Sequence, residues 1–195
     1  MTIDVAPVTG AGLAAVIPAL ARLRIAVFRD FPYLYDGDAA YEADYLAKFA
    51  RADGAVIVVA RDGADIVGAA TAAPLATQDA AWQVPLAAAG FDIDRMFYFG
   101  ESVLLASHRG QGIGHAFFDH REAQARAHGA AHAAFCSVIR ADDDPARPAD
   151  HRPLDHFWRA RGYAPLPGVT ASFDWKCVGE PDERSHALQY WARSL

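Results

Sequence analysis

The chain has 195 residues, of which 53% are hydrophobic, and a formal net charge of −6. This length suits one domain with a full core, and this composition excludes an intrinsically disordered chain. The excess of acidic residues argues against nucleic acid as a main partner, because phosphate binding needs a basic face, and it mildly favours a cationic ligand.

The N-terminus, the apolar runs and the cysteines bear on localisation. Residues 1–4 show no basic segment followed by an apolar stretch, so no signal peptide is predicted. The alanine-rich stretches are short and interrupted by charge, which predicts that no segment spans a membrane. Cys136 and Cys177 stand alone, which is typical of two free thiols in a reducing cytosol. We therefore expect a cytoplasmic protein without a membrane partner.

The first half of the chain predicts a strand, two helices and a hairpin. Residues 3–8 favour a short strand, and a helix follows with Pro18 in its first turn, ending before Pro32. Residues 39–51 favour a second helix, with its apolar stripe formed by Tyr41, Tyr45 and Phe49. Two β-rich runs around Asp62-Gly63 then predict a hairpin over 55–74.

The second half alternates strands with helices. Residues 75–94 favour a helical insertion, and 95–106 a strong central strand. After a glycine-rich turn, a helix runs to Gly129, and 131–139 favour another strand. The apolar face of that helix is expected to hold Ile113, Ala116, Phe117, His120 and Ala127, and its surface an ion pair between Glu122 and Arg126.

The last third reads as a loop, a short helix and one strand. Residues 140–153 are polar and proline-bearing, a helix ends at Gly162, and 170–178 favour the last strand. No repeat, linker or low-complexity segment interrupts residues 1–195. We therefore expect a single α/β (α+β) domain with a mixed, mostly antiparallel sheet flanked by helices.

The stretch "HRGQGIGHAFFDH", residues 108–120, places Gly110, Gly112 and Gly114 beside Arg109 where a helix begins. The first N–H groups of a helix have no internal partner, and glycine lets a ligand approach the backbone closely. Several such donors beside a full positive charge predict a pyrophosphate site, whereas a tight turn without a ligand explains three glycines poorly.

Two common nucleotide motifs do not fit. A dinucleotide fingerprint needs its third glycine one residue after Gly114 and an acidic residue at the end of the next strand. A phosphate-binding loop of the Walker type needs Gly-Lys-Ser/Thr, which is missing. The remaining pattern, Arg-x-x-Gly-x-Gly at Arg109, Gly112 and Gly114 after an apolar strand, resembles the GNAT superfamily of N-acetyltransferases.

The resemblance extends over most of the chain, and "HFWRARGYAPL" is similar to the family's late helix-turn signature. It implies that acetyl-CoA is the cofactor, with its pantetheine arm pairing along the strand and its pyrophosphate on the glycine turn. By resemblance, the cofactor-binding residues are Val103, Leu104, Leu105, Arg109, Gly110, Gln111, Gly112, Ile113 and Gly114. His151 stands where the family often has an asparagine, and is a further candidate for cofactor contact or a solvated loop residue.

Acetyl transfer to an amine needs a proton acceptor, a polarised carbonyl and a proton for the leaving thiolate. Glu101 interrupts an apolar strand and is our candidate base; the alternative is a structural carboxylate that faces solvent or forms an ion pair. The N–H near Leu104 is the candidate for polarising the carbonyl. Trp158 stands where the family usually has a tyrosine, and an indole does not titrate, so the proton donor stays open. Tyr163 is expected in the core.

The acceptor site is expected to form from the loop after the first helix, with a contribution from the 140–153 loop. Tyr33, Tyr35, Asp36 and Asp38 offer aromatic faces and negative charge, which suit an ammonium group. Packing over the core is the alternative, favoured for Tyr33. A small-molecule or protein amine is expected as substrate, and a homodimer is left open.

The histidines lack metal-ligand spacing, so no metal site is predicted. Two other classes remain as alternatives: an acyl-CoA-binding sensor without catalysis, and a nucleotide-dependent oxidoreductase, against which the glycine spacing argues.

Overall fold

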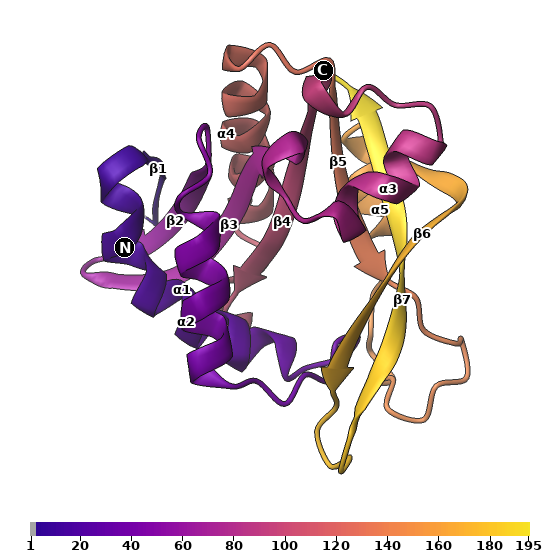
Figure 1. Ribbon diagram of the computed structural model, residues 1–195. Helices are drawn as coiled ribbons and strands as arrows, with labels where there is room; N and C mark the ends of the chain where they lie inside the picture. The colour runs from indigo at the N-terminus through magenta and orange to yellow at the C-terminus, as the bar shows by residue number, and fades with distance from the viewer. Residues whose placement is uncertain (1–2) are drawn as a thin grey trace.

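A seven-stranded sheet in the order β1-β2-β3-β4-β5-β7-β6 runs through the computed structural model, which describes residues 3–195 (Figure 1). Its strands are β1 (Asp4–Thr9), β2 (Val56–Asp62), β3 (Asp65–Pro74), β4 (Met96–Leu104), β5 (His132–Val138), β6 (Ala164–Lys176) and β7 (Glu183–Ser194). Only β4 and β5 pair in parallel; all other neighbours are antiparallel. The predicted mixed, mostly antiparallel sheet is confirmed.

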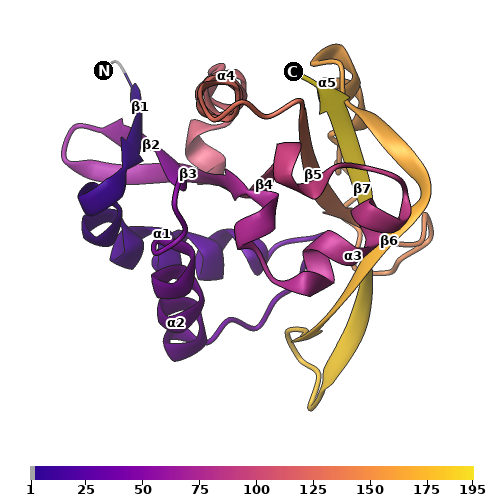
Figure 2. The same cartoon turned by 45° about the horizontal axis from the view of Figure 1, so that its top comes forward.

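Helices cover both faces of the sheet. They are α1 (Leu13–Phe28), α2 (Ala39–Phe49), α3 (Ala80–Ala88), α4 (Ile113–Ala127) and α5 (Asp155–Ala160). Figures 1 and 2 show α1 and α2 on one face and α4 on the other, with α3 beside β6. The predicted hairpin over 55–74 and the helical insertion before β4 are both confirmed.

Strand β2 shows why the central strands are almost uniformly apolar. Val56 and Val58 pack in the cluster under α4, whereas Ile57 and Val59 pack in the cluster under α1 and α2. Successive side chains of a strand point to opposite faces. With helices on both faces, each side chain must therefore be apolar, and the simple apolar–polar alternation disappears.

Strands β4 and β5 diverge along their length. Their parallel pairing is confined to Met96–Tyr98 and His132–Ala134, and Figure 1 shows the two arrows separating beyond that point. The register of β4 against β3 also shifts between Ala70 and Ala72, which marks a bulge at Gly100 and Glu101. The backbone edge of β4 that faces β5 is thereby open from Phe99 onward.

Two local predictions, about α1 and α2, are corrected. Helix α1 begins at Leu13, five residues before Pro18, because Leu13 and Val16 are buried and their packing outweighs the hydrogen bond that Pro18 cannot make. Tyr41 is 60% exposed, and the buried stripe of α2 is instead Glu42, Leu46 and Phe49.

On α4 the expected apolar face is shifted. The buried residues of α4 are Ile113, Phe117, Phe118, Arg121, Glu122 and Ala125, so Ala116, His120 and Ala127 do not belong to the buried face. The Glu122–Arg126 pair is present, with 3.6 Å between Oε2 and Nη2, and Gly129 follows the helix with φ +73°.

The strand predicted over 170–178 is present as part of β6, but the prediction that it is the last strand is wrong. The chain turns back after β6 and returns as β7, which lies between β5 and β6. Residues 183–187 are polar or small, which hides the strand, whereas Tyr190 and Trp191 are buried where β7 crosses the core. A central strand was thus missed because only its second half carries the apolar pattern.

The continuous helical segment Gly10–Phe28 has the length and apolar composition of a membrane-spanning helix, which corrects the expectation that no stretch does. Leu20 and Leu23 of this segment are buried against the rest of the protein.

Candidate functional site

The glycine turn presents a row of free amides. Gly110 and Gly112 have φ +78° and +80°, a left-handed backbone that favours glycine, and Gly112 is the N-cap of α4 without a side-chain cap. Within residues 3–195 no protein group accepts a hydrogen bond from the N–H groups of Gly110, Gln111, Gly112, Ile113 or Gly114. Such a turn at a helix N-terminus suits an anion with several oxygens.

Arg109 differs from the residues that follow it. Its N–H donates to the carbonyl of Ala106 at 3.2 Å, so it is not one of the free amides, and this part of the prediction is corrected. Its half-exposed guanidinium donates from Nε to the Leu104 carbonyl at 3.3 Å and lies 4.0 Å from Asp30. The positive charge therefore stands beside both the glycine turn and the open edge of β4.

The three residues predicted to pair with the pantetheine arm face different ways. The N–H of Leu105 donates to Val67 of β3 at 3.0 Å, and Val103 is paired with Ala69 of β3. Because alternate residues of a strand point their backbone groups to opposite sides, Leu104 faces away from β3. Of the three, Leu104 alone offers its backbone on the open edge, which corrects the prediction for Val103 and Leu105.

Glu101 lies at the bulge of β4 and is 6% exposed. Its N–H donates to the Thr71 hydroxyl at 3.2 Å, and a side chain at Gly100 would collide with that hydroxyl. The carboxylate Oε2 accepts from Nη1 of Arg24 at 2.6 Å, whereas Oε1 is buried without a hydrogen-bond partner in the described residues. The structural ion pair that was the alternative for Glu101 is therefore present, and one oxygen stays unpaired.

Arg24 also contacts a second buried carboxylate. Its Nε donates to Oε2 of Glu42 on α2, and its guanidinium lies over the ring of Tyr45 at 4.6 Å. Burial by itself lowers the pKa of Arg24, but the charge of Glu101, followed by those of Tyr45 and Glu42, raises it above its ordinary value. Arg24, Glu42 and Glu101, which we call the charge triad, therefore form one buried unit of two ion pairs between α1, α2 and β4.

Neither Arg24 nor Glu42 was singled out from the sequence. A signal did exist, because Glu42 shares helical spacing with Leu46 and Phe49, and Arg24 lies between Leu20 and Phe28 at intervals of four. A charged residue on a buried stripe implies a buried partner.

On the opposite face, Arg121 of α4 supports the bulge from beneath. It is 1% exposed and donates to the carbonyls of Phe117, Thr71 and Glu101 at 3.2, 3.4 and 3.5 Å. Burial lowers the pKa of Arg121 to about 10. A cation that bonds only to carbonyls fixes the backbone on which Glu101 stands.

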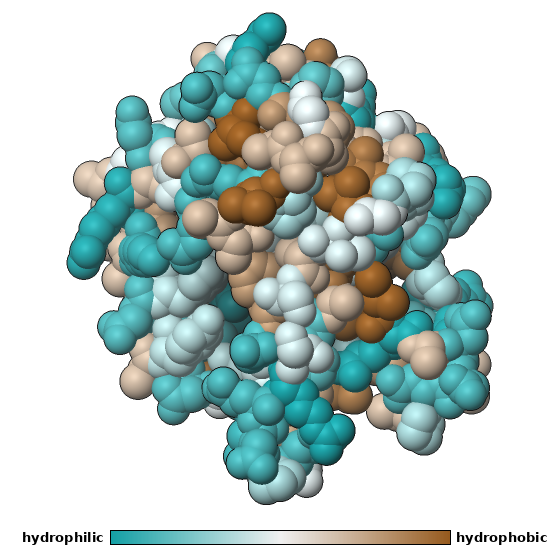
Figure 3. Space-filling view, turned by 45° about the vertical axis from the view of Figure 1, so that its right-hand side comes forward, coloured by the Kyte–Doolittle hydropathy of each residue, from teal (hydrophilic) through white to brown (hydrophobic). Residues whose placement is uncertain are grey.

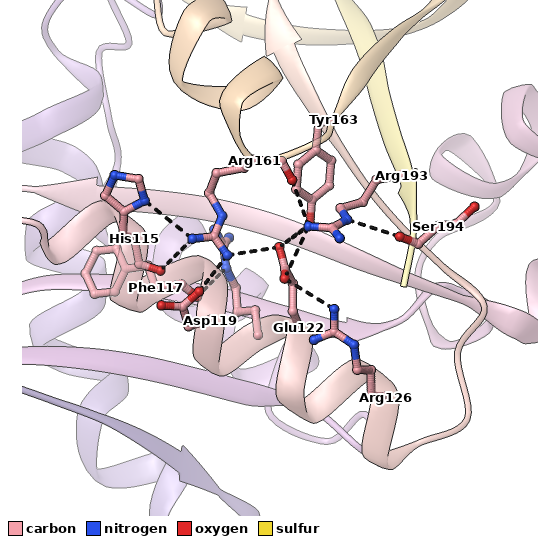
Figure 4. A network of polar contacts seen from close by, with 10 residues as sticks. His115, Phe117, Asp119, Glu122, Arg126, Arg161, Tyr163, Arg193 and Ser194 are labelled. Atoms are coloured by element: carbon pink, nitrogen blue, oxygen red, sulfur yellow. Dashed lines mark hydrogen bonds and ion pairs between the residues drawn. The ribbon is translucent and has the colours of Figure 1, made fainter.

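Glu122 joins α4 to the C-terminal part of the chain (Figure 4). It accepts from Tyr163, Arg161 and Arg193 at 3.2, 3.3 and 3.4 Å, so Tyr163 points into the core as expected. Burial, together with the charge of Glu122, raises the pKa of Tyr163. Figure 4 shows Arg161 reaching from the end of α5 to the first turns of α4, which secures the helix that begins at the glycines.

Trp158 on α5 packs against Phe135 and Trp191, with ring centroids 5.1 Å apart in both pairs. An indole in this aromatic cluster has no acidic proton to donate.

The loop of residues 29–38, here called the acceptor loop, is fastened to β6 and to the end of β5. The Tyr33 carbonyl accepts from Trp175 Nε1 at 3.0 Å and from Arg140 Nη2 at 3.1 Å, and Tyr35 bridges to Cys177. The ring of Tyr33 stacks on Phe28 at 4.2 Å, and burial raises its pKa to about 12. The packing alternative for Tyr33 is therefore present in the structure.

The acidic residues of the acceptor loop are largely engaged. Asp36 lies 3.4 Å from Arg29 and 3.2 Å from Lys176, and Asp38 accepts from the Tyr41 N–H as the N-cap of α2. Burial, and then the nearby charge of Glu42, raise the pKa of Tyr35. The structure thus brings Tyr33 and Tyr35 toward the charge triad, whereas the partly exposed Asp36 is paired with two cations at the surface.

His151 contacts the loop that follows α1. Its ring meets Phe31 of the acceptor loop edge-on at 4.7 Å. Within residues 3–195 no three His, Cys, Asp or Glu side chains are grouped to hold a metal ion. On the face shown in Figure 3, hydrophobic residues gather in the upper part, and the lower part is mostly hydrophilic.

The sequence profile of the Acetyltransferase (GNAT) family matches residues 20–154, more than half of the chain. The chain therefore belongs to the GNAT family of acetyltransferases. No curated protein matches it by sequence.

Solved structures show the same fold at low identity. A ribosomal-protein-alanine N-acetyltransferase from Brucella melitensis is similar with a TM-score of 0.63 and 17% identity over 100% of both chains. The putative acetyltransferase yncA from Salmonella typhimurium, solved with acetyl-CoA, is similar with a TM-score of 0.59 and 13% identity over 100% of this chain and 95% of the other. An aminoglycoside 6'-N-acetyltransferase complexed with coenzyme A is similar with a TM-score of 0.60 and 14% identity over 100% of this chain and 97% of the other.

Proposed function

We propose that this protein is an acetyl-CoA-dependent N-acetyltransferase that acetylates a primary amine of a cationic acceptor. Membership of the GNAT family supports acetyl transfer, and two structural neighbours were solved with acetyl-CoA or coenzyme A. The observation that carries the proposal is the row of free amides from Gly110 to Gly114 at the start of α4, beside the open edge of β4.

The residues present fit this cofactor. Five free N–H groups match a pyrophosphate, which has many acceptor oxygens, and Arg109 adds a positive charge. Acetyl-CoA, when bound, supplies the acetyl group as a thioester. The open backbone of Leu104 suits the extended arm, and its N–H, held rigidly by the sheet, would polarise the carbonyl.

Glu101 is the proposed base. Its Oε2 is held by Arg24, and its unpaired Oε1 is the atom that receives the proton from the amine, directly or through water. Trp158 cannot protonate the leaving thiolate. We assign the protonation of the thiolate to water or to a side chain other than Trp158.

The acceptor is proposed to lie against the acceptor loop, where Tyr33 and Tyr35 adjoin the charge triad. The triad holds two carboxylates and one guanidinium, so it carries one excess negative charge, which favours a cationic acceptor. We propose a cytoplasmic location, with a small-molecule or protein amine as substrate, and assign no role to nucleic acid.

Following the release of free coenzyme A with a panel of amines tests the function. We expect release only with amines that are also acetylated, as seen by mass spectrometry. Tight acetyl-CoA binding without acetylation of any amine would instead indicate a binding protein, and binding of NAD(P) in preference to acetyl-CoA would overturn the proposal.

A further inference from the structure

We propose that Arg24 and Glu42 are positioning residues for Glu101, and that Glu42 keeps Glu101 basic by sharing the charge of Arg24. This inference deepens the proposed function and rests on it, since it assigns a role to the two residues behind the proposed base.

The geometry makes the three side chains one unit. Arg24 points its Nε at Oε2 of Glu42 and its Nη1 at Oε2 of Glu101, the latter at 2.6 Å. The side chains of Arg24, Glu42 and Glu101 are 12%, 0% and 3% exposed. At this burial, solvent screens the charges little, so the state of one carboxylate is felt by the other.

The unit has one positive and two negative charges. A carboxylate that is the sole ion-pair partner of an arginine is a weak base, because the cation stabilises its ionised form. Here the guanidinium is divided between two carboxylates, and the second negative charge opposes the ionised form of the first. In both carboxylates Oε1 is also buried without a hydrogen-bond partner in the described residues, so each carboxylate is bound to Arg24 through one oxygen only.

The other groups around Glu101 do not supply this effect. From α2, Tyr45 lies under Arg24, and from the acceptor loop Tyr33 faces the unit; burial raises the pKa of both phenols, which keeps them neutral. From α4, Arg121 bonds to the Glu101 carbonyl, and from β3, Thr71 accepts from its N–H. Among these neighbours Glu42 alone brings a second negative charge.

The proton step follows from the two oxygens of Glu101. An N–H bond of the protonated acceptor amine, an ammonium ion, breaks directly or through a water molecule, and the proton bonds to Oε1 while Oε2 stays on Arg24, which leaves a neutral amine. The electron pair left on nitrogen is then free for attack on the carbonyl carbon. Glu42 touches neither reactant and acts only through Arg24.

The first test compares the pH dependence of kcat/KM in wild type, Glu42→Gln and Asp44→Asn. Asp44 lies on the same helix but is exposed, so the second variant removes the same charge away from the triad. We expect Glu42→Gln to move the acidic limb about one pH unit lower and to reduce the plateau several-fold. Asp44→Asn should match wild type. If the acidic limb of the kcat/KM profile keeps its position in Glu42→Gln, whatever the loss of kcat, the role of Glu42 is only structural.

The second test needs no activity. The chain has five glutamates, so ¹³C labelling of the glutamate side-chain carboxyl groups alone gives a simple NMR spectrum. The signal missing in Glu101→Gln belongs to Glu101. We expect its titration midpoint to fall in Glu42→Gln. The variant Glu42→Asp keeps the charge further away and should give a smaller shift in the same direction, which secures the test if Glu42→Gln does not fold.

The two tests separate the two proposals. An unchanged Glu101 midpoint in both variants overturns the role of Glu42, even if the wild type acetylates amines. A wild type that acetylates nothing overturns the proposed function, and the NMR midpoints still decide whether Glu42 controls Glu101.

Discussion

Nη1 of Arg24 lies 2.6 Å from Oε2 of Glu101, although the two residues are 77 positions apart. Arg24 comes from α1 and Glu101 from the bulge of β4, so the contact joins a covering helix to the strand beside the glycine turn. The candidate base is held at its side chain by Arg24 and at its backbone by Thr71 and Arg121.

Replacing Glu101 by Gln should remove the base and keep the shape of the site. We expect kcat to fall by about a hundredfold or more, with the affinity for acetyl-CoA unchanged. The loss should be largest above the acidic limb of the wild-type profile, where the carboxylate is ionised, and the limb should vanish. Steady-state rates across pH measure this; a variant that keeps the limb would exclude Glu101 as the base.

Replacing Gly112 by Glu should abolish acetyl-CoA binding. Gly112 has φ +80° at the N-cap of α4, so a side chain strains the turn, and a carboxylate repels the pyrophosphate. Gly129→Glu is the matched control, because Gly129 has φ +73° at the other end of α4 with open space around it. Calorimetry should show lost binding in the first variant only; equal affinities would contradict the placement of the cofactor.

Replacing Glu122 by Ala should destabilise the fold. It leaves Arg161 and Arg193 without their buried carboxylate and frees the Tyr163 hydroxyl, which we expect to lower the free energy of unfolding by about 3 kcal/mol. Asp119→Ala, which removes an exposed partner of Arg161, should cost less than about 1 kcal/mol. Denaturant unfolding measures both, and equal losses would show that burial of Glu122 is not the cause.

Cys136 should be nearly inert in the native protein. Burial raises its pKa to about 12 from the ordinary value of 9.0. In a Cys177→Ser background we expect alkylation at pH 8 to be about a thousandfold slower than after unfolding, since only the thiolate reacts. The free energy of unfolding should also fall as the pH rises from about 9 to 12, because the unfolded thiol ionises first. Rapid alkylation of the native protein would contradict the shift.

Local patterns predicted most of the elements and the glycine turn at the start of α4. The glycine turn was recognisable because its chemistry resides in the backbone of consecutive residues, Gly110 to Gly114, where spacing in sequence is spacing in space. Strand β7 was not predicted because residues 183–187 are polar or small, although tertiary packing places them in a strand.

Side-chain partnerships followed a different logic. The sequence placed a carboxylate at Glu101 but could not choose between a base and an ion pair, because Arg24 and Glu42 reach it only when α1 and α2 pack over β4. The same holds for Leu104 and Leu105, whose opposite backbone directions depend on pairing with β3.

The sequence by itself determined the family, the mixed sheet and the glycine turn, since these depend on apolar periodicity and on backbone freedom, which are local properties. Only the tertiary structure decided which oxygen of Glu101 is free, which amides remain unpaired and where the last strand inserts. These depend on contacts between distant segments, whose energies no local pattern of residues records.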